Sequence, residues 1–148
     1  MATPEETPMR NSTYGDLLDD LRVPTRELRH MDPATWEGFA HLHRAAMADG
    51  ELSSVAKELI ALAIAVTTQC DGCVASHARA AARAGATPAQ VAEALGVCLL
   101  MAGGPASVYA PRAWEAFREF SVDARDDTDP RLPVVAGASA DLTPEPSG

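Results

Sequence analysis

The stretch KELIALAIAVTTQCDGCVASH, residues 57–77, decides how the whole sequence is interpreted. It begins with an uninterrupted apolar run of eight residues, Leu59–Val66. A helix needs about 20 apolar residues to span a bilayer, so this run is too short for that role. We therefore predict a helix that is buried on most sides, either inside the subunit or between subunits.

Helix boundaries outward from this stretch are indicated by capping residues and by Gly and Pro. Asp32 before Pro33 is typical of a helix start, and Thr87, Pro88 and Gln90 form a capping-box pattern. The expected helices are Tyr14–Leu21, Pro33 to Gly50, Ser53 or Ser54 to Val66, Cys70 or Asp71 to Gly85, Pro88 to about Met101, and Val108–Phe120. No convincing alternation typical of strands occurs, so the predicted fold class is all-α.

Two segments are harder to place by pattern. Arg22–His30 is interrupted by Pro24, and Gly103–Pro105 is expected to break the chain before the last helix. The helix after Pro33 is expected to turn one inner face to the core, made of Trp36, Phe39, Ala40, His43 and Met47.

The length of 148 residues and the change in composition along the chain predict one domain, residues 14–120. Residues 1–13 lack an apolar core and are expected to form a flexible arm rather than a targeting segment. Residues 121–148 are rich in Asp and Pro, which predicts a flexible tail. Short apolar patches in this tail suggest that it docks on a partner or a neighbouring subunit.

The charge balance excludes several partners. Twelve Lys and Arg against 21 Asp and Glu give a net charge of -9, the wrong sign for gripping nucleic acid or an anionic membrane. Three cysteines are too few for a secreted disulfide framework. We therefore expect a cytoplasmic protein with neither nucleic acid nor membrane as a partner.

One constellation carries candidate chemistry: Glu58, Cys70, Cys73 and His77, in the pattern E-x11-C-x2-C-x3-H. At about 100° per residue, the two thiols and the imidazole share one helix face. Two cysteines at this spacing can close into a disulfide if the first lies at the helix entrance. The helix N-terminus favours the thiolate, and His77 can accept the thiol proton while Glu58 orients the imidazole. Such a set can reduce a peroxide by way of a sulfenic acid.

The cysteines could also serve in a metal site, a haem attachment or a thioredoxin-like fold. With His77, the C-x-x-C pair offers three zinc ligands, but a structural site needs four and no second ligand pair follows. Haem attachment fails because Val74, not His, follows Cys73. A thioredoxin-like fold is disfavoured because both flanks are helical. We expect Cys98 to be a small core residue, and we expect neither a metal nor a cofactor.

Residues 57–77, with RAGAT at 83–87 and LGVCLLMAGGPASVYA at 95–110, resemble the carboxymuconolactone decarboxylase-like superfamily, in its alkylhydroperoxidase D-like (AhpD-like) branch. The resemblance implies an AhpD-like helical bundle that assembles as trimers or as hexamers of dimers. It implies that Cys73 is the attacking thiol, Cys70 its disulfide partner, His77 the base and Glu58 the relay acid. It also implies a thiol reductant, such as a lipoylated protein.

One position departs from the branch. Its peroxidases carry a relay histidine immediately before the second cysteine, where this chain has Gly72. The expected function is a cofactor-independent thiol peroxidase, or a related disulfide reductase, acting on hydrogen peroxide or small organic hydroperoxides. A non-catalytic redox-sensing or assembly protein is the alternative. A lactone decarboxylase is disfavoured because that branch of the superfamily lacks the C-x-x-C pair.

Overall fold

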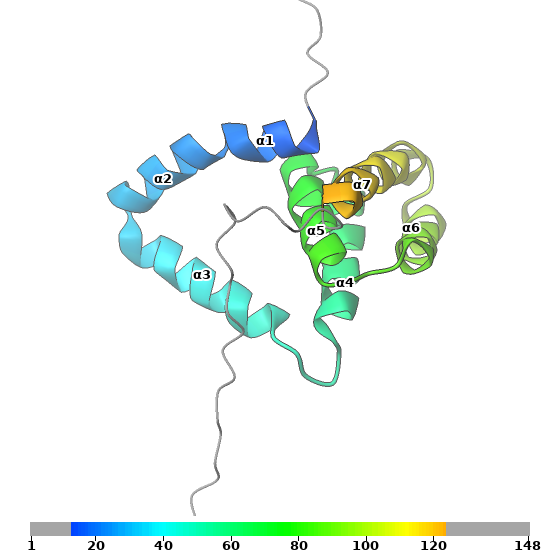
Figure 1. The fold of residues 1–148 in the computed structure, drawn as a ribbon, viewed down its shortest axis with the longest axis horizontal. Helices are drawn as coiled ribbons and strands as arrows, with labels where there is room; N and C mark the ends of the chain where they lie inside the picture. Colours follow the sequence, from blue (N-terminus) through cyan, green and yellow to red (C-terminus); the bar gives the residue numbers. More distant parts are fainter. Residues whose placement is uncertain (1–12, 124–148) are drawn as a thin grey trace, which may run out of the picture.

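The structure is a computed structural model that describes residues 13–123, and the expectations for residues 1–12 and 124–148 lie outside this part. Its seven helices are α1 (Tyr14–Asp20), α2 (Arg22–Met31), α3 (Pro33–Met47), α4 (Ser54–Thr67), α5 (Asp71–Arg83), α6 (Pro88–Ala102) and α7 (Gly104–Asp123). Figure 1 shows α4–α7 gathered into a bundle, which we call the body, with α5 between α4 and α7. The all-α prediction is confirmed for the described residues.

The core of the body is built mainly from small and aliphatic side chains. It is centred on Leu62, Val74, Val91 and Phe117, and alanines fill most of the space between them. Because alanine projects only one methyl group, it lets neighbouring helices pack without large side chains between them. This explains how a chain with 5% aromatic residues still forms a closed core.

Local capping sets most helix starts, as the sequence predicts. Asp32 accepts the N–H of Thr35, and Ser53 accepts the N–H of Ala56. The Thr87 box is complete, because the Gln90 side chain returns a bond to the Thr87 N–H. These bonds satisfy donors that a helix leaves unpaired at its first turn.

Two prolines are accommodated where the sequence suggests a break. Pro24 lies in the first turn of α2, where a missing N–H costs nothing. Gly103 ends α6 with a φ of 58°, and α7 begins at once at Gly104, so Pro105 also falls in a first turn. The last helix therefore starts four residues before the expected Val108 and continues three residues past Phe120.

Helices α2 and α3 form an arm that buries none of its residues, which corrects the expected inner face of α3. Of the five expected residues, Phe39 and His43 are exposed, and Trp36, Ala40 and Met47 are only half-buried. The physical reason is the path of the chain: Figure 1 shows α1, α2 and α3 in an arc that leaves the body and returns to it only at α4. The amphipathic pattern of α3 is real, but within residues 13–123 no helix covers its apolar side.

Helix α1 anchors the start of this arc to the body. The Glu119 carboxylate of α7 accepts the N–H groups of Tyr14 and Gly15 at 3.1 and 2.9 Å. Tyr14 and Leu18 also pack against the core. The acidic side chain thus neutralises the positive end of the α1 dipole and holds α1 beside α5 and α7.

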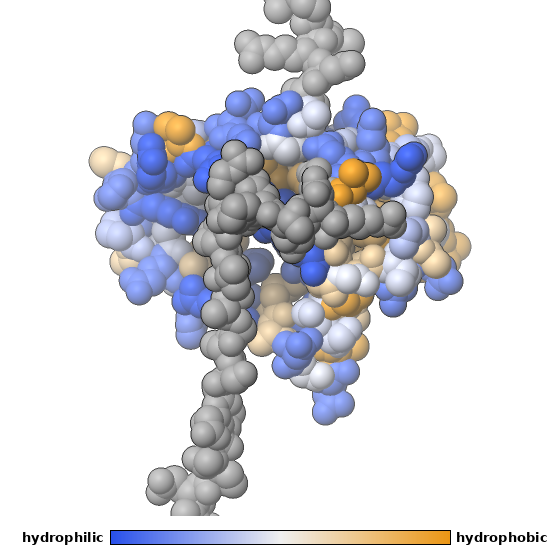
Figure 2. Space-filling view, viewed as in Figure 1, coloured by the Kyte–Doolittle hydropathy of each residue, from blue (hydrophilic) through white to orange (hydrophobic). Residues whose placement is uncertain are grey.

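The apolar run of α4 is only partly enclosed. Leu62, Ala65 and Val66 are buried, whereas Ile60 and Ile64 are half or more exposed. The run Leu59–Val66 was expected to be buried on most sides. Within one chain it is buried only on the face toward α5 and α6. Figure 2 shows further apolar surface over the α6 side of the body, while the surface over α1 and α2 is mostly hydrophilic.

Candidate functional site

The turn between α4 and α5 places Cys70 at the helix entrance. The N–H of Cys70 donates to Ala65 O at 3.1 Å, and the N–H of Gln69 donates to Val66 O at 3.2 Å. This is a Schellman ending for α4, with Gln69 in the left-handed position at a φ of 56°. Glycine is the usual residue there, so the turn holds Gln69 in a costly conformation. Cys70, the next residue, serves at once as the N-cap of α5.

The two motif cysteines are joined at this entrance. Cys70 and Cys73 form a disulfide, with their Cα atoms 5.2 Å apart, and Cys70 Sγ accepts the N–H of Cys73 at 3.3 Å. Cys73 lies in the first turn of α5 and is exposed, while Cys70 is half-buried. Unpaired N–H groups at a helix start favour a thiolate over a thiol, and both sulfurs lie at such a start.

An acid and an imidazole meet one turn further along α5. His77 Nδ1 lies 2.8 Å from Glu58 Oε2, and the two side chains are 23% and 10% exposed. Glu58 is the one charged residue of the described chain that is buried. The contact joins residues 19 positions apart on α4 and α5 and fixes the orientation of the ring. His77 Nε2 then remains as the ring atom that can exchange a proton.

Two residues that the sequence does not indicate contact the segment between the cysteines. Leu21, between α1 and α2, lies beside Gly72, and its Cδ1 would be 3.5 Å from a Cβ added there. Arg112 of α7 pairs with Asp71 at 3.4 Å and stacks over the Tyr109 ring at 4.8 Å. No sequence spacing indicates these contacts, because they join helices that are distant in the chain. The position of the relay histidine of the branch is thus bordered by an apolar side chain.

The remaining thiol is separate from this site. Cys98 is buried in the core and donates its S–H to Ala94 O at 3.4 Å. Burial raises the pKa of the Cys98 thiol, because the charged form loses its hydration. Within residues 13–123 no three His, Cys, Asp or Glu side chains are grouped to hold a metal ion.

No helix in the described part of the chain is both long and apolar enough to cross a membrane.

The sequence and the fold both match known proteins. The model of the carboxymuconolactone decarboxylase family matches residues 33–116, more than half of the chain, so the chain belongs to this family. The matched range covers Glu58, Cys70, Cys73 and His77. The family assignment agrees with the resemblance that the motif suggests.

Individual relatives support the same assignment. An uncharacterized protein from Cupriavidus necator is 42% identical over 100 residues, which cover 68% of this chain and 88% of the relative. An uncharacterized protein in the cox locus of Paracoccus denitrificans is 40% identical over 77 residues, covering 52% and 69% of the two chains. The crystal structure of an apo carboxymuconolactone decarboxylase family protein from Legionella pneumophila is similar with a TM-score of 0.71 and 39% identity, over 73% of this chain and 96% of that one.

Proposed function

We propose that this chain is a thiol-dependent peroxidase that reduces hydrogen peroxide or small organic hydroperoxides. The observation that carries the proposal is the disulfide between Cys70 and Cys73 one turn from His77, whose Nδ1 lies 2.8 Å from Glu58. It combines a redox pair at a helix start with a proton acceptor held by a buried carboxylate. The disulfide is the oxidised end state of the proposed cycle.

In the first half of the cycle, the Cys73 thiolate attacks one oxygen of the peroxide. An S–O bond forms as the O–O bond breaks, and the leaving alkoxide or hydroxide takes up a proton to become an alcohol or water. His77 supplies that proton after accepting it from the Cys73 thiol, and Glu58 stabilises the imidazolium in between. Cys73 is now a sulfenic acid.

In the second half, the Cys70 sulfur attacks the Cys73 sulfur. The S–S bond forms, the S–O bond breaks, and the hydroxide leaves as water after taking the Cys70 proton. The two electrons lost by the thiols have reduced the peroxide. A thiol reductant, which we propose to be a dithiol such as a lipoylated protein, returns two electrons and two protons.

The test is peroxide consumption with a panel of thiol reductants, including a dihydrolipoyl domain. Cys73→Ser is expected to abolish turnover, and Cys70→Ser to block disulfide formation while still allowing Cys73 to be oxidised. Cys98→Ala is the matched control, because that thiol is buried in the core, and it is expected to leave turnover near the wild-type rate. Undiminished turnover in both motif variants contradicts the proposal.

A non-catalytic redox sensor is the second candidate, and Gly72 favours it. The peroxidases of the branch have a relay histidine where this chain has Gly72, next to Leu21. Oxidation of the cysteines without turnover under every reductant supports this second candidate. Activity on a lactone that survives replacement of both cysteines supports a decarboxylase instead.

We also propose that the chain works as a homo-oligomer, a trimer or a hexamer. The arm buries none of its residues, and Phe39 and Leu42 of α3 are exposed, as are Ile64 of α4 and Leu100 of α6. Exposed apolar side chains on several helices are typical of surfaces that pack against another subunit.

Mass measurement by light scattering after gel filtration tests this assembly. The wild type is expected at a multiple of 15.5 kDa. Phe39→Glu with Leu42→Glu is expected to lower that multiple. The control pair His41→Glu with Ala45→Glu, which lies away from Phe39 on the same helix, is expected to keep it. A wild type that runs as a monomer at micromolar concentration contradicts the proposal.

A further inference from the structure

Four arginines lie where the α1–α2 junction faces α5, and we call them the arginine cluster: Arg22, Arg26, Arg79 and Arg83. Arg22 and Arg26 line a surface pocket of about 410 Å³. Arg79 and Arg83 lie one turn apart on α5, so they share a face of that helix. The residue before Arg22 packs beside Gly72, which places the cluster next to the disulfide but outside the catalytic set.

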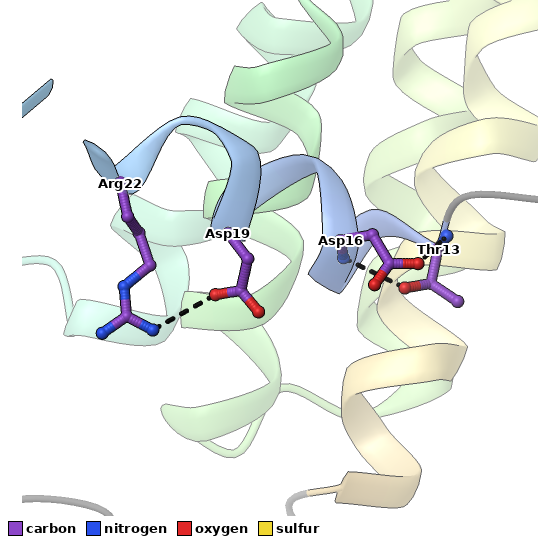
Figure 3. A network of polar contacts seen from close by, with 4 residues as sticks. All are labelled: Thr13, Asp16, Asp19 and Arg22. Carbon is purple, nitrogen blue, oxygen red and sulfur yellow. Dashed lines mark hydrogen bonds and ion pairs between the residues drawn. The ribbon is translucent and has the colours of Figure 1, made fainter. Parts of the chain in front are cut away.

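The positive charge of this cluster is largely unneutralised. Arg22 pairs with Asp19 at 3.2 Å, as Figure 3 shows along the α1–α2 junction. Among the described residues no carboxylate lies within ion-pair distance of Arg26, Arg79 or Arg83. The pKa of Arg79 is lowered by its partial burial and by repulsion from Arg83 and Arg22, with Asp19 acting in the opposite sense. A chain with a net charge of -9 therefore keeps a concentrated basic surface.

The end of α7 lies beside this cluster. The Arg79 guanidinium sits 6.0 Å from the centre of the Phe120 ring, and α7 ends three residues later at Asp123. The next residues in the sequence are ARDDTD, 124–129, with three aspartates at 126, 127 and 129. At about 3.3–3.6 Å per residue these carboxylates can reach roughly 10–20 Å from Asp123. Because Arg79 contacts Phe120, three residues before Asp123, this reach is enough to meet the cluster at Arg79.

We propose that the arginine cluster is a docking surface for the acidic segment Asp126–Asp129 of the same chain. Charge complementarity and reach both favour this occupant. A tethered segment is present at an effective concentration of about millimolar, whereas a separate anionic macromolecule is repelled by the acidic chain as a whole. The inference goes beyond the proposed peroxidase function and does not depend on it.

The amide resonance of Thr128 in the full-length chain reports the docking. We call the displacement the difference in amide chemical shift between Thr128 in this chain and Thr128 in a free peptide of residues 124–133. A displacement is expected at about 0.01 M salt. The difference is expected to shrink about threefold or more at about 1 M salt, where the Debye length has fallen from about 30 to about 3 Å. A Thr128 resonance equal to that of the peptide at low salt overturns the proposal.

Charge reversal identifies the surface. Arg79→Glu with Arg83→Glu is expected to give the peptide resonance at both salt concentrations, and replacing the three aspartates by arginine in that background is expected to restore the difference. Arg44→Glu with Lys57→Glu is the matched control, with the same change of charge away from α2 and α5, and it is expected to leave the resonance displaced. Retained displacement in the Arg79 and Arg83 variant overturns the proposal.

Two further measurements keep the result decisive. Arg22→Glu with Arg26→Glu changes two exposed side chains, so it tests the cluster even if replacing the half-buried Arg79 unfolds the body. This variant is expected to at least halve the displacement. An unchanged displacement overturns the proposal. The displacement is expected to be independent of protein concentration. A displacement that grows with concentration overturns the proposal, because it means that the segment docks on a second copy.

Discussion

The body and the arm of this chain have similar amphipathic helices but opposite packing. Phe117 of α7 is 2% exposed inside the body, whereas Phe39 of α3 is 60% exposed on the arm. Burying a phenylalanine contributes about 1.5–3 kcal/mol, so Phe117 stabilises the single chain and Phe39 does not. The difference teaches that an apolar face shows a need for a partner, but not whether that partner is in the same chain.

The functional candidates follow the same division. Both cysteines, Glu58 and His77 lie in the body, where packing on several sides holds them in place. The arm contributes no member of this set; it contacts the body at α4 and is joined at its other end to α1. We therefore expect the body to carry the chemistry and the arm to carry the assembly.

The largest expected effect tests this contrast directly. Phe117→Ala leaves a cavity in the core and is expected to lower the free energy of unfolding by about 3–5 kcal/mol. Phe39→Ala is expected to cost the monomer less than about 0.5 kcal/mol, because its ring is already in water. Urea unfolding over a range of protein concentrations separates the two cases. Equal losses under monomeric conditions would break the contrast between body and arm.

The next effect concerns the acid and imidazole pair. His77→Ala removes the hydrogen-bond partner of a buried carboxylate and is expected to cost about 1–3 kcal/mol of unfolding free energy. His43→Ala on the arm is the control, expected within about 0.5 kcal/mol of the wild type because His43 is exposed. The readout is again chemical denaturation. A His77 variant as stable as the wild type would mean that the pair adds nothing to the body.

A smaller effect is expected from the helix caps. Thr87→Ala removes the capping box of α6 and is expected to cost about 1 kcal/mol of unfolding free energy. Asp32→Ala removes an equivalent cap from α3, but it is expected to change the cooperative transition of the monomer little and to lower only local helicity. Circular dichroism and amide exchange distinguish these outcomes. If Asp32→Ala costs as much as Thr87→Ala, the arm unfolds together with the body.

The smallest effect is expected at Cys98. Because burial raises its pKa, less of this thiol is ionised at any given pH than of an ordinary cysteine. In the reduced chain at pH 8, alkylation of Cys98 is expected to be about tenfold or more slower than that of Cys73, and to speed up only at higher pH. Mass spectrometry of peptides from a time course measures both rates. Equal rates would show that the core of the body opens readily.

Much of the fold was predictable because the signals are local. The caps at Asp32, Ser53 and Thr87 act within three residues of themselves, and the structure confirms each of them. The expected break before the last helix was wrong in detail, since Gly103 ends α6 and α7 starts at Gly104. Proline is tolerated in the first turn of a helix, and whether Pro105 falls within one depends on where the helix begins.

The candidate site was predictable in its members but not in its surroundings. The spacing of Cys70, Cys73 and His77 places them on one helix, and the expected position of Cys70 at its entrance is what the structure has. The contacts of Leu21 and Arg112 with this region were not foreseen, because they join segments 41 or more residues apart.

The sequence by itself determined which segments are helical, where most of them start, and which four residues share a chemical pattern. The helix assignments depend on neighbours within about one helical turn, and the pattern of the four residues is contained in residues 58–77. Only the tertiary structure decided that Glu58 is buried against His77, that α3 leaves Phe39 exposed, and that Arg22 comes close to Arg79 of α5. These contacts join residues that are distant in the sequence. They depend on how all the helices pack together, which no local pattern specifies.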